Sequence, residues 1–142
     1  STHRGTLFPY TTLFRSMKWV HIGEEIKYDW YELRCQLSQE NHLQIFLEGL
    51  KNQKLKYCID FGKFLFCRSI DEGWGLNLLE EDLLIGPEFP NLSDGILLEM
   101  IDSHLKKRVK KIYSVPIYHY QVHGINFGID VLTVAIPIIK KI

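Results

Sequence analysis

Two histidines four residues apart, His119 and His123, have the spacing of a metal-binding pair. On a helix this spacing would place both imidazoles on one face. The surrounding residues 117–123 have the composition of a strand instead, and residues four apart in a strand are about 13 Å apart. Zinc binds each ligand at about 2 Å, so the two rings cannot share one ion. We expect both histidines to face solvent and predict no metal site.

The motifs that position a nucleophile are also absent from this sequence. It contains no G-x-S-x-G turn and no glycine-rich phosphate loop. Its cysteines fall within expected strands, away from the helix N-termini that lower a thiol pKa. We therefore predict no catalytic residue and no cofactor-binding residue, and we expect the protein not to be an enzyme. Four carboxylates, Asp60, Asp71, Glu72 and Asp130, could form a catalytic site if the fold brought them together. The sequence alone does not show that it does.

Aromatic residues set among carboxylates are the remaining candidates for function. Tyr28 and Trp30 fall on the face opposite the apolar one, which they share with Glu32, while Trp74 follows the acidic turn at residues 71–73. Aromatic side chains ringed by acids are typical of surfaces that bind basic proteins. We take Tyr28, Trp30, Glu32 and Trp74 as candidate partner-binding residues. The alternative is that these aromatics form a second core layer beneath a helix.

A series of short strands must position these residues. Between residues 28 and 37 the side chains alternate, with Tyr31, Leu33, Cys35 and Leu37 on the inward face. The same alternation returns at residues 42–48 and 55–61. Polar turns separate the segments at intervals of about a dozen residues, which is typical of an antiparallel meander. The expected strands are residues 18–22, 28–37, 42–48, 55–61, 64–69, 74–79, 117–123 and 125–137.

Gly62 leaves two arrangements open. If Gly62 and Lys63 form a two-residue hairpin turn, Cys58 and Cys67 lie directly opposite each other. If Gly62 is a bulge instead, one bent strand continues through it. Because Cys35, Cys58 and Cys67 are an odd number without C-x-x-C spacing, we expect reduced thiols.

One helix is expected between the two groups of strands. Ser93 is a suitable N-cap, and apolar residues recur every three or four positions through residues 94–112, the pattern of an amphipathic helix. Its buried stripe should include Leu97, Ile101 and Leu105. The predicted fold class is therefore α+β, a mostly meander antiparallel β-sheet with one amphipathic helix packed on one face.

The first sixteen residues are expected to lie outside this domain. Residues 6–16, TLFPYTTLFRS, resemble the translation of a sequencing adapter at every position. We interpret residues 1–16 as a non-native N-terminal scar and residues 17–142 as a single α+β domain, beginning at Met17. The alternative is a genuine N-terminal hairpin. Without Arg4 and Arg15, 15 basic residues face 17 acidic ones.

This near-neutral charge bears on partners and location. A small net charge provides no global field to attract nucleic acid or an anionic membrane, so we expect neither as a partner. The basic run at residues 106–111 is interpreted as a solvated helix end. No apolar run reaches the roughly 18 residues that span a bilayer, and no secretory signal follows Met17. We expect a cytoplasmic protein.

Two segments resemble a known class of proteins. Residues 58–76 (CIDFGKFLFCRSIDEGWGL) and 117–139 (IYHYQVHGINFGIDVLTVAIPII) are similar to small bacterial immunity proteins encoded beside polymorphic or contact-dependent toxins. The similarity covers strand framework residues in roughly a third of residues 17–142. It implies stoichiometric binding of a cognate toxin with no chemistry of the protein's own. The alternatives are an uncharacterised structural or interaction module, or a small-ligand-binding or enzymatic α+β domain.

Overall fold

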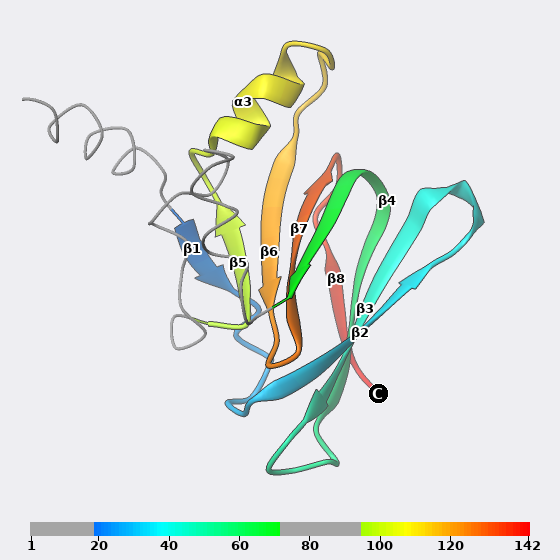
Figure 1. Ribbon diagram of the computed structural model, residues 1–142, viewed down its shortest axis with the longest axis vertical. Coiled ribbons are helices and arrows are strands. Elements are labelled where there is room, and N and C mark those ends of the chain that lie inside the picture. The colour runs from blue at the N-terminus through cyan, green and yellow to red at the C-terminus, as the bar shows by residue number, and fades with distance from the viewer. Residues whose placement is uncertain (1–18, 72–94) are drawn as a thin grey trace, which may run out of the picture.

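The structure is a computed structural model that describes residues 19–71 and 95–142. Within these ranges the chain is mostly antiparallel β-sheet, with one short α-helix and one 3₁₀ turn (Figure 1). The predicted strand at residues 74–79, Trp74 itself and the proposed scar lie outside the described residues. The elements are β1 (Trp19–Ile22), β2 (Tyr31–Leu37), η1 (Gln39–Asn41), β3 (His42–Gly49), β4 (Lys56–Asp71), β5 (Leu97–Met100), α3 (His104–Lys110), β6 (Tyr118–His123), β7 (Phe127–Thr133) and β8 (Ile138–Lys141).

The sheet combines two meanders joined through β4. Its strand order is β1-β5-β6-β7-β4-β3-β2, with β8 paired to β4 outside this path. The run β2-β3-β4 follows the predicted meander, and β6-β7 is the predicted final strand pair, which β5 extends to a second meander. The meander is wrong between them, because β4 pairs with β7 rather than with the next strand in sequence. All pairings in the described ranges are antiparallel, so the predicted α+β class with an antiparallel sheet is confirmed.

Strand β4 continues through Gly62 instead of reversing there. Gly62 has a φ of 65°, a conformation that glycine adopts without steric cost, and the pairing with β3 shifts register beside it. The ribbon of β4 curves over along its length (Figure 1), and its first half pairs with β3 and β8 while its second half pairs with β7. The bulge interpretation is therefore correct. Cys58 lies opposite Phe46 and Lys140, Cys67 lies opposite Val131, and both are free thiols.

The two halves of the sheet enclose the main hydrophobic core. The inward residues predicted for β3 and for the first half of β4 are all buried, whereas in β2 the inward face is buried only at Tyr31 and Leu33. Cys35 and Leu37 are exposed, because the end of β2 extends beyond the core. The core consists of Tyr31, Leu33, Leu43, Ile45, Leu47, Leu55, Tyr57, Ile59 and Phe61 from one half, and Leu97, Tyr120, Val122, Ile129 and Val131 from the other.

The turn between β6 and β7 fastens the two halves together. The Asn126 amide donates to the Leu33 carbonyl at 2.9 Å, and its oxygen accepts from the Leu33 N–H at 3.0 Å. Ile125 N–H donates to the Tyr31 carbonyl at 2.9 Å. The approach is so close at Gly124 that a Cβ atom there would lie 2.3 Å from Leu33 Cγ. Glycine is therefore required for the turn to reach β2.

The predicted helix at residues 94–112 is wrong in its first half. Leu97–Met100 form strand β5, which pairs with β1 and β6. Leu97 lies in the main core, while Leu98 and Met100 point to the opposite face and are also fully buried. An apolar run that is buried on both faces does not alternate, so its periodicity does not distinguish strand from helix.

Within residues 95–112 only His104–Lys110 is helical, and this helix packs on one face of the sheet. Ser103 is its N-cap, because its Oγ accepts from the Lys106 N–H at 3.0 Å. Leu105 is buried against Ile117 and Leu132 in a second, smaller apolar cluster, with Val109 at its edge. Of the predicted stripe, Leu97 and Leu105 are buried, but Ile101 is 43% exposed.

The predicted last strand, residues 125–137, is shorter in the structure, and an additional strand follows it. Strand β7 ends at Thr133, whose hydroxyl donates to the Ala135 carbonyl at 2.6 Å. The chain then returns as β8 along the first half of β4. In the described ranges, no helix has the length and apolar character needed to cross a bilayer.

Candidate functional site

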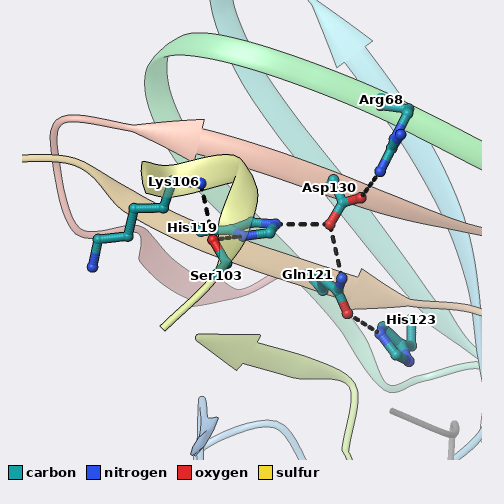
Figure 2. A network of polar contacts seen from close by, with 7 residues as sticks. All are labelled: Arg68, Ser103, Lys106, His119, Gln121, His123 and Asp130. Carbon is teal, nitrogen blue, oxygen red and sulfur yellow. Dashed lines mark hydrogen bonds and ion pairs between the residues drawn. The ribbon is translucent and has the colours of Figure 1, made fainter. Parts of the chain in front are cut away.

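A buried chain of polar side chains crosses the face of the sheet beneath α3 (Figure 2). Ser103 Oγ lies 2.7 Å from His119 Nδ1, and His119 Nε2 lies 2.8 Å from Asp130 Oδ1. Each of these three residues is at most 1% exposed. A serine, a histidine and an aspartate thus lie in hydrogen-bonding sequence inside the protein.

The direction of each hydrogen bond follows from the chemistry of the partners. An ionised carboxylate only accepts, so His119 donates from Nε2 to Asp130. With the proton on Nε2, Nδ1 accepts from the Ser103 hydroxyl. The hydroxyl oxygen in turn accepts from the Lys106 N–H. The hydrogen-bonding groups of the Ser103, His119 and Asp130 side chains therefore all have partners, as is usual for buried polar groups.

Three further side chains complete the network around Asp130. Arg68 on β4 and Gln121 on β6 are the direct cross-strand neighbours of Asp130 on β7. Arg68 Nη2 lies 2.9 Å from Asp130 Oδ2, and Gln121 Nε2 donates to Oδ1 at 2.8 Å. His123 Nε2 donates to Gln121 Oε1 at 3.1 Å. The network therefore links β4, β7 and β6 to the N-terminus of α3 (Figure 2).

Asp130 is the ionised centre of this network. Complete burial raises the pKa of its carboxyl, but the hydrogen bond from His119 and the Arg68 guanidinium outweigh this and hold the pKa below its ordinary value of 3.8. A buried carboxylate is tolerated where it is paired and fully hydrogen-bonded. Asp130 meets both conditions.

The residue types match a Ser-His-Asp triad, but the geometry indicates a structural role. A catalytic serine must present Oγ to a substrate carbonyl. Ser103 is 1% exposed, and its Oγ already accepts the capping bond of α3. The interpretation of His119 and His123 as solvent-facing residues is also wrong, since both are buried in this network. The prediction of a helix on one face of the sheet did not specify that this helix would cover the face of residues 119 and 123.

The lowered pKa of Asp130 predicts a specific pH dependence. Below the unfolded pKa of about 3.9, the unfolded chain takes up a proton that folded Asp130 still resists, so acid lowers the free energy of unfolding. The stabilisation from Asp130 is complete above this range and is lost as the pH falls through the folded pKa. We expect the stability difference between the wild type and Asp130→Asn to be largest near neutral pH and to shrink below about pH 4. Urea denaturation at a series of pH values measures this. A difference that is constant with pH would contradict the assignment.

The sequence analysis missed the network because it expected a tight reversal at Gly124 between the last two strands. That turn would pair His123 with residue 125, whereas in the structure His123 pairs with Gly128. The expected reversal at Gly124 alone does not bring Gln121 opposite Asp130. In the structure the turn spans four residues, with Gly124 N–H donating to the Phe127 carbonyl at 3.0 Å. The available signal was the polar alternation of His119, Gln121 and His123 within an apolar segment, which places all three on one face.

The predicted partner-binding residues lie elsewhere, at the start of β2. Tyr28 is 83% exposed, Trp30 is half-buried and Glu32 is exposed. Glu32 follows buried Tyr31 and precedes buried Leu33, so it points away from the main core, as predicted. Trp74 lies outside the described residues. The structure thus places Tyr28, Trp30 and Glu32 within one short segment.

Buried Asp29 holds this segment against the turn between β3 and β4. Its carboxylate accepts from the backbone N–H groups of Trp30, Lys51 and Asn52 at 2.7, 3.1 and 2.9 Å. Burial raises the pKa of Asp29, but these three bonds bring it below the ordinary value. Asp29 is therefore ionised at neutral pH and fixes the backbone between Tyr28 and Trp30.

Two buried tyrosines fix the other side of Tyr28. The Tyr31 hydroxyl donates to the Lys27 carbonyl, and the Lys27 N–H donates to the Tyr57 hydroxyl at 3.1 Å. The rings of Tyr31 and Tyr57 pack edge to face in the main core. The backbone on both sides of Tyr28 is thus anchored to buried groups while its side chain is exposed.

The adjoining sheet surface has a pair of like charges. Glu32 lies directly opposite Glu48 on β3, and both side chains are exposed. Like charges directly opposite each other destabilise a strand pair. The Leu50 N–H donates to the Trp30 carbonyl at 2.7 Å, which places exposed Leu50 beside Trp30. We call these five residues, Tyr28, Trp30, Glu32, Glu48 and Leu50, the β2 surface.

In the part of the chain that the structure describes, no three His, Cys, Asp or Glu side chains gather to hold a metal ion. The arrangement offers an exposed aromatic on a fastened backbone beside the exposed carboxylates of Glu32 and Glu48, the second of which also lies opposite Lys56. A separate buried polar network joins sheet to helix. No protein-family model, no curated protein and no solved structure matches this chain.

Proposed function

We propose that this chain is a cytoplasmic immunity-type protein that neutralises a cognate bacterial toxin by stoichiometric binding through the β2 surface. The observation that carries the proposal is Tyr28, whose exposed ring projects from a backbone segment fastened on both sides by buried Asp29, Tyr31 and Tyr57. A side chain presented by a rigid backbone loses little conformational freedom on binding, so more of its contact energy appears as affinity.

The charges of the β2 surface favour a basic partner. Exposed Glu32 and Glu48 repel each other across the strand pair, and a lysine or arginine of the partner would relieve this repulsion. Exposed carboxylates also accelerate the encounter with a basic protein. Half-buried Trp30 and exposed Leu50 provide apolar area between Tyr28 and the two glutamates.

Co-expression with the toxin encoded by the neighbouring gene tests the proposal. We expect the wild-type chain to restore growth and the double variant Trp30→Ala/Glu32→Lys to lose this rescue. Truncating an aromatic at the centre of an interface costs about 2 kcal/mol or more, which is about a thirtyfold loss of affinity, and the charge reversal slows association with a basic partner. Circular dichroism verifies that the variant is folded.

A second double variant provides the matched control. Ile136→Ala/Glu40→Lys truncates one exposed apolar side chain and reverses one exposed acidic charge outside the β2 surface, and it should rescue growth as the wild type does. Failure of the wild-type chain to rescue would refute the immunity function. Equal rescue by both double variants would exclude the β2 surface as the binding site.

A further inference from the structure

The end of α3 and the chain that follows it combine positive charge with exposed apolar side chains. Residues 103–117 contain five basic residues and no acidic ones. Lys107 pairs with Asp102 at 3.0 Å. For Arg108, Lys110 and Lys111, all exposed, no ion pair is found within residues 19–71 and 95–142.

Three apolar side chains beyond α3, those of Ile112, Tyr113 and Val115, are exposed rather than packed on the sheet. Leu105 and Val109 form the side of α3 that packs on the sheet. Beyond them the chain turns, with the N–H groups of Ile112 and Tyr113 both donating to the Val109 carbonyl at 2.9 and 3.1 Å. Ile112 is 78% exposed, although helical periodicity predicts it to be buried, and Tyr113 and Val115 are 44% and 46% exposed. We call residues 107–115 the α3 tip.

The α3 tip lies at one end of the long axis of the molecule (Figure 1). A projecting end can reach into a layer of headgroups, whereas protein interfaces of stable complexes are broad patches of about 800 Å² on each partner. The phosphates of a nucleic acid could pair with the cations, but they provide no apolar contact for exposed Ile112 and Val115. A nucleic acid therefore accounts for only half of this surface. The combination of cations with protruding apolar side chains is typical of segments that sit in the interface of an anionic bilayer.

We propose that the α3 tip binds the surface of an anionic lipid bilayer, independently of the β2 surface. Arg108, Lys110 and Lys111 contact the lipid phosphates and carboxylates, and Ile112, Tyr113 and Val115 enter the boundary between headgroups and acyl chains. The expectation of no membrane contact came from the near-zero net charge. Charges act at a membrane only within the Debye length, about 8 Å at physiological ionic strength, so the local cluster decides the contact. A few cations and short apolar side chains produce reversible binding at the surface.

Sedimentation of the full chain with lipid vesicles tests this proposal. We expect binding to phosphatidylcholine vesicles that contain about a quarter phosphatidylserine, much weaker binding to pure phosphatidylcholine, and weakening by salt. Lys110→Glu/Lys111→Glu should reduce the affinity at least about tenfold. Ile112→Ser should reduce it at least about threefold, because the lost contact is apolar.

Two controls decide the specificity of the effect. Lys51→Glu/Lys54→Glu changes the net charge equally at exposed lysines of the turn between β3 and β4, and it should bind as the wild type does. An equal loss in this variant, or equal binding to both kinds of vesicle, would overturn the proposal. Binding to a DNA duplex that needs Lys110 and Lys111 but is unchanged in Ile112→Ser, without vesicle binding, would instead identify a nucleic-acid contact and refute the lipid assignment.

Discussion

Asp130→Ala should lower the free energy of unfolding by about 3–5 kcal/mol, the cost of breaking a buried ion pair from one side. The substitution leaves the Arg68 guanidinium, the Nε2–H of His119 and the Gln121 amide without their common acceptor. All three donors belong to strands that meet at Asp130, so the loss affects the junction of β4, β7 and β6 together. Urea denaturation at neutral pH, followed by circular dichroism, measures the change.

Asp102→Ala is the matched control for this experiment. Asp102 also pairs with a cation, Lys107, at nearly the same distance, 3.0 Å against 2.9 Å for Asp130 and Arg68. Its side chain is 39% exposed, and surface ion pairs contribute about 0–1 kcal/mol. If the two variants lost equal stability, Asp130 would not be the buried centre of a network.

Leu97→Ala should lower the free energy of unfolding by about 2–5 kcal/mol, the range for a leucine removed from a packed core. Leu97 lies on β5, is fully buried and contacts the main core from the half of the sheet opposite β3. The alanine would leave a cavity that the two paired neighbours of β5 cannot close, because β1 and β6 hold it in register. Equilibrium unfolding in urea measures this effect.

Ile101→Ala distinguishes the strand from the helix that the sequence predicts. In a helix over residues 94–112, Leu97 and Ile101 would share one buried stripe, and both substitutions would have similar costs. In the structure Ile101 follows the end of β5 and is 43% exposed, so its replacement should cost less than about 1 kcal/mol. Similar losses for Leu97→Ala and Ile101→Ala would contradict the observed end of β5 at Met100.

The strands predicted best are those with one face in the core and one face in solvent. In β3 the buried Leu43, Ile45 and Leu47 alternate with residues that are half-buried or exposed. Successive side chains of a strand point to opposite faces, so the alternation in the sequence shows which residues face the core. The same reason makes the outward direction of Glu32 predictable.

The helix prediction failed at β5, because a strand that is buried on both faces shows no alternation of apolar and polar residues. Leu97, Leu98 and Met100 are all buried, and nothing in a short apolar run states whether two sheet neighbours or a helix will bury it. Pairing with β1 and β6 decides for the strand, because it satisfies the backbone groups on both edges of β5. The helix then begins only at His104, where the hydroxyl of the preceding Ser103 caps it.

The sequence by itself determined the antiparallel meander of β2, β3 and the first half of β4, and the outward direction of Glu32, because these depend on local alternation. Only the tertiary structure decided that β4 passes from one half of the sheet to the other, and that Arg68 and Asp130, 62 residues apart, become cross-strand neighbours. It also decided that Ile112 stays exposed among cations while Leu105 is buried. Such outcomes depend on which distant segment covers each face, and a side chain's own sequence neighbours contain no information about that.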